Sequence, residues 1–374
     1  MAPPLLTAAL KFGRRFGLTL KFWLALTASV VVACALALTA AVGHLLSWPF
    51  ALSLLLIAAT SARLKFRSWP GIHSPPTPFD RPAAEAPPGS VRVVCVSDTH
   101  GKIERERVPD GDVLIHAGDF TQLGSRAEVA AFNEWLGSLP HKHKVVVPGN
   151  HDLICDGQTC EANVRRLRAQ QTFHGMAVEE FYGAEAGAGG AAERLSEGAM
   201  RALLGNARVL VGEACEVEVD VDAHGGATRR RISIFGFPYT DPIPTSAMAA
   251  FARDDDERRR LLRQFDRRVD ILVTHGPPHG VLDRIFNGMR VGCKVLTQRL
   301  VELAREDKSP TFHVFGHIHE GRGVKYGAVL HSRAEDGTHA KVASKTTYVN
   351  ASSVNLKYDL RPGLSKAMVF DIPR

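Results

Sequence analysis

Five short clusters of Asp, Asn and His residues stand out in this chain, because these side chains bind metal ions and move protons. Each cluster follows a short apolar run that is typical of a β-strand, so each would lie at the carboxyl end of its strand. The clusters are Asp98-Thr99-His100, Gly118-Asp119, Gly149-Asn150-His151-Asp152, Thr274-His275 and Gly316-His317-Ile318-His319.

The spacing within these clusters suits metal coordination. Asp98 and His100 are two residues apart, so their side chains point the same way if the backbone is extended. Asp119 follows a glycine that lets the backbone turn closely, and its two carboxylate oxygens can bridge two metal ions. A mixture of oxygen and imidazole ligands favours Mn, Fe or Zn over an all-oxygen Mg or Ca site. The expected metal ligands are Asp98, His100, Asp119, Asn150, His275, His317 and His319.

Two such metal ions, about 3.5–4 Å apart, would clamp a phosphoryl group, lower the pKa of a bridging water and stabilise an in-line displacement. His151 follows Asn150 directly and would face the substrate. It is the candidate to protonate the leaving oxygen or to stabilise charge on it. Asp152 is the candidate to hold the His151 ring in the required tautomer.

Any single cluster has an ordinary structural interpretation. A lone His in an apolar strand is usually structural, and Gly-Asp is commonly a turn. Five clusters in this order, each at the end of a strand, form a specific pattern, because their structural context agrees with the chemistry.

The elements that must position these clusters alternate from residue 91 onward. Ala127–Leu139 has apolar residues at helical spacing, and Arg258–Arg268 and Lys294–Arg305 show the same pattern. Strands that alternate with helices predict an α/β domain with buried sheets. The expected strands are Val91–Ser97, Val113–Ala117, Lys144–Pro148, Arg231–Phe235, Asp270–Thr274, Thr311–Phe315, Thr346–Asn350 and Ala367–Ile372.

Two stretches have the composition of insertions, Gly183–Ala192 and the polar His331–Ser344, and each is expected to be a flexible loop or a hairpin tip. The acidic run Asp254–Glu257 is followed by three arginines. A basic patch for an anionic partner is one interpretation. A solvated helix start, with acids at the positive end of the helix dipole, is the favoured one.

The charge of the chain is unevenly distributed. The 374 residues carry a formal net charge of +7, and no acidic residue precedes Asp80. The basic residues of that segment account for the whole excess, so the globular part is neutral overall, which argues against a nucleic-acid partner. Six cysteines without a CxxC pair indicate a reducing compartment, although Cys155 and Cys160 could pair.

The N-terminal segment has the features of a membrane anchor. No Lys, Arg, Asp or Glu occurs from Phe22 to Ala62. As a helix this run would be about 60 Å long, twice a bilayer core of about 30 Å. It predicts a transmembrane helical hairpin with spans near residues 22–44 and 49–63, the second short enough to be re-entrant or interfacial. Basic residues flank both outer ends, which places the globular domain on the cytoplasmic side of the membrane.

Two other interpretations of this segment are weaker. The apolar run is too long for a cleaved signal peptide, and it lacks the amphipathic pattern of an organelle transit peptide. Residues 68–90 contain seven prolines and should form a stiff, extended linker. The expected organisation is therefore a membrane segment at 1–67, a linker at 68–90 and a globular domain at 91–374.

The cluster order DxH, GD, GNHD, H and GHxH resembles that of the metallophosphoesterase superfamily, the calcineurin-like phosphoesterases, across residues 91–372. More narrowly, stretches such as VCVSDTH, DVLIHAGDFTQLG and HVFGHIHEG resemble the small metallophosphoesterase-domain-containing family. The resemblance implies a four-layer αββα sandwich and phosphodiester hydrolysis, with cyclic nucleotides as candidate substrates. It implies one metal ion held by Asp98, His100, Asp119 and His319, and a second held by Asp119, Asn150, His275 and His317.

These observations predict a membrane-anchored, two-metal phosphodiesterase. A phosphomonoesterase or protein phosphatase would use the same ligands, because metal geometry alone does not set the type of ester. A non-catalytic scaffold that kept the fold is the third hypothesis. The usual signature of such a scaffold is the loss of metal ligands, whereas this chain keeps the complete set. The set includes His317, the first His of the GHxH cluster, which some members of the family that the chain resembles lack.

Overall fold

The computed structural model describes residues 78–80, 86–102, 104, 108–173, 176–182, 195–223, 226–242, 246–333, 339–355 and 367–373. The larger of two compact units comprises residues 75–283 and 292–374. The expected membrane spans, most of the linker and Gly183–Ala192 lie outside the described residues. Within the described part of the chain, no helix is both long enough and apolar enough to span a membrane.

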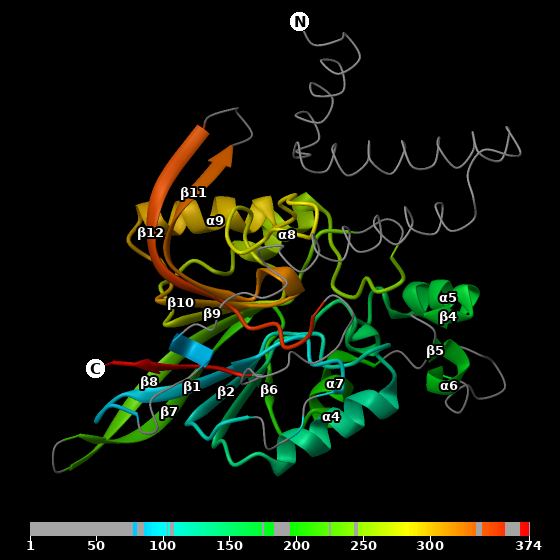
Figure 1. Cartoon of the computed structure of the whole chain (residues 1–374), viewed down its shortest axis with the longest axis horizontal. Helices are drawn as coiled ribbons and strands as arrows, with labels where there is room; N and C mark the ends of the chain where they lie inside the picture. Colours follow the sequence, from blue (N-terminus) through cyan, green and yellow to red (C-terminus); the bar gives the residue numbers. More distant parts are fainter. Residues whose placement is uncertain are drawn as a thin grey trace, which may run out of the picture. The chain divides into compact units, whose positions relative to one another are not determined.

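Two β-sheets form the middle of the larger unit (Figure 1). The first has the strand order β13-β1-β2-β3-β6, in which only β13 runs antiparallel to its neighbour. Its strands are β1 (Val91–Val96), β2 (Val113–His116), β3 (His143–Val146), β6 (Arg208–Val209) and β13 (Met368–Ile372).

The second sheet has six strands in the order β11-β12-β10-β9-β8-β7. Its centre, from β12 to β8, is parallel, and an antiparallel hairpin closes each edge. The strands are β7 (Glu213–Ala223), β8 (Gly226–Phe237), β9 (Ile271–Thr274), β10 (Phe312–Phe315), β11 (Gly323–Arg333) and β12 (His339–Asn350).

Alternation along the strands divides the apolar side chains between separate cores. Val93 and Cys95 of β1 join the core between the two sheets, together with Val314 of β10. Val94 and Val96 point to the opposite face and join a core that also contains helical residues. Successive strand residues face opposite sides, so a fully apolar strand is buried on both faces. The apolar runs of the sequence therefore report sheets covered on both sides.

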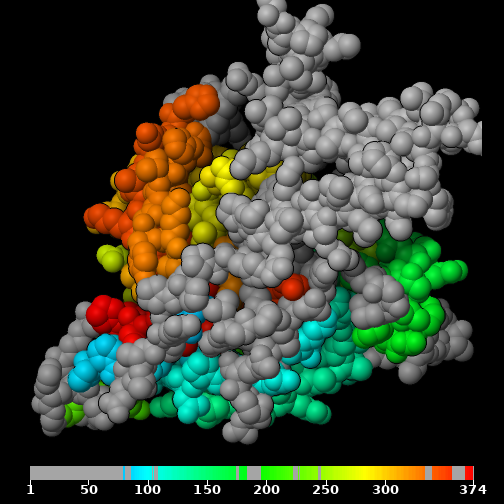
Figure 2. All heavy atoms as spheres, viewed as in Figure 1, coloured from blue at the N-terminus to red at the C-terminus, as the bar shows by residue number. Residues whose placement is uncertain are grey.

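Helices cover the two outer faces, which gives the layer order helix, sheet, sheet, helix implied by the resemblance (Figure 1). The helices on the five-stranded sheet are α4 (Arg126–Ser138) and α7 (Glu197–Leu203); α5 (Cys160–Gln170) and α6 (Val178–Tyr182) lie to one side of it and join the same apolar core. Those on the six-stranded sheet are α8 (Asp255–Leu262) and α9 (Lys294–Arg305). In Figure 2 the β11–β12 hairpin (orange) and the region from β2 to α4 (cyan to teal) form separate parts of the visible face.

Five short elements complete the described part of the unit. They are the 3₁₀ turns η1 (Pro78–Asp80), η3 (Leu153–Cys155) and η4 (His319–Gly321), and the small strands β4 (Thr172–Phe173) and β5 (Met176–Ala177).

Three expectations for the secondary structure need correction or completion. The described part of His331–Ser344 belongs to the paired strands β11 and β12, which agrees with the expected hairpin and not with a flexible loop. Its polar character reflects a sheet edge with exposed positions along β12. Helix α8 begins at Asp255, because the Asp254 side chain accepts a hydrogen bond from Glu257 N, and it ends at Leu262, before Arg268. The described cysteines, Cys155 and Cys160 among them, are free thiols.

Candidate metal centre

The carboxyl ends of the parallel strands of both sheets meet at one end of the sandwich. A main-chain bridge between Ser97 and Ser352 joins the end of β1 to the end of β12. The residues that follow β1, β2 and β3 thereby come close to those that follow β9 and β10. They are Asp98, His100, Asp119 and Asn150 from the five-stranded sheet, and His275, His317 and His319 from the six-stranded sheet.

The structure brings the expected ligands into three overlapping groups. Potential ligand atoms of Asp98, His100 and His319 lie within 4.8 Å of one another, and so do those of Asp119, His275 and His317. A third group joins Asp119 and His100 to His151. The Asp119 carboxylate therefore reaches both sets of ligands, as a bridging group must.

Asn150 completes the second group. Its Oδ1 lies 2.9 Å from His275 Nε2, and its Nδ2 donates to Met248 O at 3.2 Å. Because the amide nitrogen is bound on the Met248 side, the amide oxygen is turned toward the histidines. Ala250 N also donates to Asn150 O, at 3.1 Å, which fixes the backbone of the same residue.

Most imidazoles of these groups are oriented by backbone carbonyls. A carbonyl only accepts hydrogen bonds, so a ring nitrogen beside it carries the proton and the other nitrogen is left to bind a cation. The Nδ1 atoms lie beside carbonyl oxygens in four pairs: His100 with Thr121 (2.9 Å), His151 with Gln122 (2.7 Å), His275 with Ala117 (2.9 Å) and His319 with Asn355 (3.2 Å). This donor set fits divalent cations bound through Nε2 and carboxylate oxygens.

Electrostatic interactions couple the buried carboxylates to the histidines. Burial opposes the ionisation of Asp98 and Asp119, but nearby histidines together outweigh it, chiefly His319 for Asp98 and His275 for Asp119. The pKa of each carboxyl is therefore lowered. Burial alone would lower the pKa of His275, but Asp119, with its Oδ1 3.3 Å from His275 Nε2, raises that pKa to about 9. A metal ion competes with protons for such ligands.

The backbone is unusual at these positions. Four of the expected ligands have positive φ angles, a region that costs a residue other than glycine about 1–2 kcal/mol. Hydrogen bonds between neighbouring loops hold it: Asp98 N donates to Gly118 O at 2.9 Å, and His100 N donates to Asp119 O at 3.1 Å. The angles are 52° at Asp98, 45° at His100, 55° at Asp119 and 65° at His317.

Two glycines of the clusters leave no room for a side chain. A Cβ atom on Gly149 would lie 2.3 Å from Asp119 Oδ1, and one on Gly316 would lie 2.1 Å from Asp98 Oδ2. Both distances are far below van der Waals contact. The glycines are therefore required so that the ligand carboxylates can approach the neighbouring backbone.

Comparison with known proteins agrees with this geometry. Residues 91–321 match the family model described as calcineurin-like phosphoesterase. The chain belongs to the calcineurin-like phosphoesterase family. It is 36% identical to human "Metallophosphoesterase domain-containing protein 1" over 302 residues, which cover 80% of this chain and 75% of that protein. It is 31% identical to a UPF0046 protein of Caenorhabditis elegans over 310 residues, covering 80% of this chain and 85% of that protein.

Membership of the calcineurin-like phosphoesterase family implies phosphoester hydrolysis with divalent metal ions. The family assignment confirms the resemblance stated from the sequence. It also agrees with the clusters of candidate ligands, which were expected from the same motifs.

The structure corrects the expected role of Asp152 in this phosphoesterase. The group that faces His151 Nδ1 is the carbonyl of Gln122, not a carboxylate. The buried Asp152 carboxylate instead accepts hydrogen bonds from the backbone N–H groups of Asp119 (3.0 Å), Thr121 (3.0 Å) and Gly149 (2.7 Å). Two of these N–H groups belong to the loop after β2 and one belongs to the loop after β3. The Asp152 carboxylate therefore holds the two loops together.

Burial and the neighbouring Asp119 charge raise the pKa of Asp152 to about 7, against the hydrogen bonds from Gly149 and Thr121, which lower it. A cation bound at Asp119 would offset part of that repulsion. Asp152 is thus better described as a structural anchor of the centre than as a partner of the His151 ring.

Three supporting residues were not singled out from the sequence. Ser352 Oγ donates to Asp98 Oδ2 at 2.8 Å, and the buried Arg322 donates to Ser352 O at 2.8 Å. Arg322 also forms an ion pair with Asp80 at 2.7 Å, with both side chains almost fully buried. Phe79 beside it contacts the ring of Phe370, with ring centroids 5.6 Å apart. The middle of the proline-rich segment, at Phe79 and Asp80, therefore packs on the domain near a candidate metal ligand.

A buried ion pair holds the loop that contacts Asn150. Arg253 forms hydrogen bonds to both carboxylate oxygens of Asp156, at 3.1 and 3.0 Å. The Arg253 guanidinium also lies 5.3 Å from the ring centroid of Tyr239. Neither Asp156 nor Arg253 belongs to a metal cluster, and the only signal in the sequence was a pair of opposite charges far apart.

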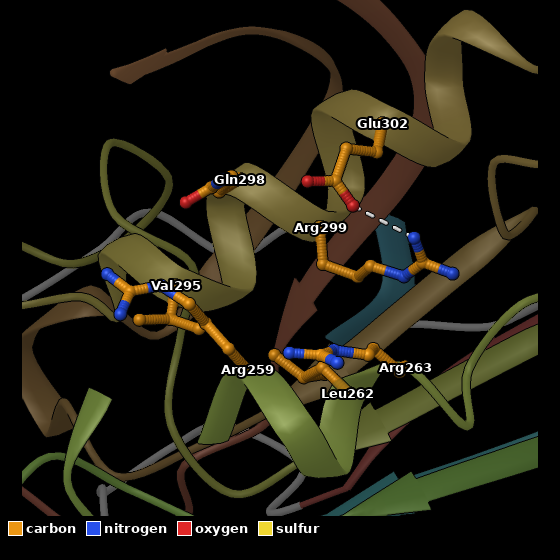
Figure 3. Close-up of a pocket in the computed structure, with 7 residues that line it drawn as sticks. All are labelled: Arg259, Leu262, Arg263, Val295, Gln298, Arg299 and Glu302. Atoms are coloured by element: carbon orange, nitrogen blue, oxygen red, sulfur yellow. Dashed lines mark hydrogen bonds and ion pairs between the residues drawn. The ribbon is translucent and has the colours of Figure 1, made fainter. Parts of the chain in front are cut away.

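A cavity of about 230 Å³ between α8 and α9 is separate from this centre (Figure 3). It is lined by residues of the two helices and by none of the metal clusters. The guanidinium groups of Arg259 and Arg299 point to opposite sides of it, and Arg299 is paired with Glu302 at 2.8 Å. The arginines therefore do not converge on one anion.

Proposed function

We propose that this chain is a phosphodiesterase with a dinuclear metal centre. The observation that carries the proposal is the position of Asp119, which groups with His275 and His317 on one side and with His100 and His151 on the other. His100 in turn groups with Asp98 and His319, so Asp119 lies between two sets of candidate ligands, as a two-metal site requires. Asp98, His100, Asp119 and His319 would hold one ion, and Asp119, Asn150, His275 and His317 the other. Bound Mn, Fe or Zn ions supply Lewis acidity and lower the pKa of water.

The residues around the ions would bind and orient the phosphoester. His151 is tied through Nδ1 to Gln122 O, so Nε2 is the nitrogen that exchanges a proton with the leaving oxygen. His151 is only 5% exposed, which limits the access of bulk water to this step. Cyclic nucleotides or related phosphodiesters are the substrate class that the resemblance supports.

The test is hydrolysis by the full chain of a chromogenic aryl phosphodiester and of the matching monoester. Each ester is assayed with added Mn²⁺ and with a chelator. Cleavage of the diester that depends on Mn²⁺ and stops with chelator is the expected result. A preference for the monoester would replace this proposal by a phosphatase. Metal binding without cleavage of either ester would favour a non-catalytic, membrane-tethered scaffold.

We also propose that the N-terminal segment anchors the enzyme in a membrane, with the catalytic domain on the cytoplasmic side. The proposal rests on the apolar run and its basic flanks. It predicts that the full chain sediments with membranes in high salt and alkaline carbonate. Protease added to sealed cells should leave the domain intact. Release of the chain by carbonate would contradict membrane insertion.

A further inference from the structure

The N-terminus of α4 has a carboxylate with more partners than helix capping requires. Ser125 caps this helix, and Glu128 accepts in return from Ser125 N at 3.0 Å, as in a capping box. Glu128 also accepts from Gln122 N at 2.7 Å and from Leu123 N at 3.2 Å. One side chain thus binds three backbone N–H groups of the loop that follows β2.

The peptide between Gln122 and Leu123 connects this carboxylate to the candidate centre. Its N–H group, on Leu123, faces Glu128, and its C=O group, on Gln122, accepts from His151 Nδ1 at 2.7 Å. A trans peptide is planar and its N–H and C=O groups point in opposite directions. Glu128, the peptide and the His151 ring therefore form one hydrogen-bonded chain.

The surroundings keep this chain in place. Thr121 Oγ1 donates to His151 O at 3.1 Å, and Ile154 N donates to Gly124 O at 3.3 Å. Gln122 and His151 are 7% and 5% exposed, so water cannot readily replace their contact. The loop 121–125 and the loop 151–154 consequently move as one unit if they move at all.

We infer that Glu128 is a positioning residue for His151, acting through the Gln122–Leu123 peptide; this inference rests on the proposed function. Glu128 fixes the direction of the Gln122 carbonyl and, by accepting from the same peptide, strengthens that carbonyl as an acceptor. The carbonyl keeps a proton on Nδ1, so the proton that passes to the leaving oxygen is the Nε2 proton of the imidazolium, and the ring left behind is the neutral Nδ1–H tautomer.

The test compares leaving groups in the full chain loaded with Mn²⁺. Two aryl phosphodiesters are used, one that releases p-nitrophenolate and one that releases phenolate, because only the poorer leaving group needs a proton. The variants are Glu128→Ala, Glu128→Gln and, as the reference for a lost acid, His151→Ala. Ser125→Ala is the matched control, since it removes the side-chain cap of the same helix and the 3.1 Å hydrogen bond from Ser125 Oγ to Glu128, but leaves the Glu128 contacts to Gln122 and Leu123.

The expected result is a loss of hydrolysis rate that is larger for the phenolate ester than for the nitrophenolate ester. Because general acids contribute about 10²–10⁴-fold, His151→Ala should lose at least about a hundredfold on the phenolate ester and much less on the nitrophenolate ester. Glu128→Ala should show the same selectivity at about tenfold, with Glu128→Gln between it and the wild type. Ser125→Ala should keep the wild-type ratio of the two rates. An unchanged ratio in Glu128→Ala would overturn the inference.

A second measurement separates this inference from the proposed function. Nitrogen NMR of histidine-labelled full chain reports which ring nitrogen of His151 carries the proton. Glu128→Ala should lose the uniform Nδ1–H form, whereas Ser125→Ala should keep it. Failure of the wild type to cleave either ester would refute the proposed function but leave this tautomer test standing. The Nδ1–H form retained in Glu128→Ala would refute the inference even in an active phosphodiesterase.

Discussion

The two sheets contribute differently to the candidate metal centre. The five-stranded sheet carries all the expected oxygen ligands and one expected imidazole ligand. The six-stranded sheet carries expected imidazole ligands alone, which are His275, His317 and His319. Only Asp98 and Asp119 carry negative charge in the expected ligand set, so the attraction for cations comes from one half of the sandwich.

The halves also differ in how their ligands are held. In the five-stranded half, the Asp152 carboxylate binds the loop after β2 to the loop after β3, and the Glu128 carboxylate accepts from backbone N–H groups within the loop after β2. Ligands of the six-stranded sheet are held by contacts across to the first sheet. His317 N donates to both oxygens of Asp98 at 3.0 Å, and His275 Nδ1 lies 2.9 Å from Ala117 O. His275 and His317 therefore depend on the packing of the two sheets, whereas the loops after β2 and β3 are held to each other by contacts within the five-stranded half.

The largest expected difference is between a shared oxygen ligand and a single imidazole. Asp119→Ala should reduce phosphoester hydrolysis about a thousandfold or more, because the metal ions contribute several kcal/mol to the transition state. His317→Ala removes a neutral ligand from one group and should cost less. Steady-state rates over a range of Mn²⁺ concentrations measure both. Higher activity in Asp119→Ala than in His317→Ala would refute the expectation that the shared carboxylate contributes more than the single imidazole.

A smaller effect is expected from the ion pair that joins the two halves. Burial alone would raise the pKa of Asp156, but Arg253 holds it below the usual value. The stabilisation is therefore complete above the unfolded pKa of about 3.9 and disappears as the pH falls through the folded value. Asp156→Asn leaves Arg253 buried without its counter-charge and should lower the free energy of unfolding by about 3 kcal/mol at pH 7.

Urea unfolding of the full chain at pH 7 and pH 3 checks this expectation. The difference between wild type and Asp156→Asn should narrow at pH 3, because the Asp156 carboxyl of the unfolded chain, with its ordinary pKa of about 3.9, is largely protonated there. An equal difference at both pH values would show that the charge of Asp156 is not what stabilises the loop.

The next effect comes from the close approach of Gly149 to Asp119, in the loops that follow β3 and β2. Gly149→Ala places a Cβ atom 2.3 Å from Asp119 Oδ1 and should displace that ligand. Overpacking costs about 1–3 kcal/mol, and a displaced catalytic group costs about a hundredfold in rate. Gly198→Ala in α7 is the control, because no atom lies within 4 Å of the added Cβ. It should leave the rate unchanged and stabilise the helix by about 0.5–1 kcal/mol.

The smallest effect should come from a contact that supports a ligand across the two sheets. Ser352→Ala removes one of the hydrogen bonds to Asp98 but leaves the two from His317 N. Loss of such a supporting contact weakens metal binding by about 10–100-fold. Calorimetric titration with Mn²⁺ measures it, with the exposed Ser138→Ala as control. Equal affinities in both variants would remove Ser352 from the support of the centre.

The ends of the parallel strands could be predicted from the sequence, because two independent patterns coincide there. Apolar runs mark buried parallel strands, and the clusters of metal-binding side chains follow them directly. Strand β7 was missed although Val217 and Val219 are buried and Glu216 and Glu218 alternate with them. Its period-two pattern was present, but half of its residues are charged, which hides an edge strand from a search for apolar runs.

The role of Asp152 could not be predicted from its position beside His151. A carboxylate binds whichever donors the fold brings near it, and here these include Asp119 N and Thr121 N, about thirty residues away in the sequence. Glu128 and Ser352 were overlooked for the same reason. Ligand identity follows from residue type and spacing, whereas support of the ligands depends on contacts that only the folded chain defines.

The buried pair of Asp80 and Arg322 has a practical consequence for anyone who prepares a fragment of this protein. A fragment that starts at β1, where the family match begins, would leave the Arg322 guanidinium enclosed without its carboxylate. Breaking a buried pair in this way costs about 3–5 kcal/mol, a large part of the 5–15 kcal/mol that keeps a typical domain folded. Expression fragments should therefore begin before Pro78, so that Phe79 and Asp80 are retained.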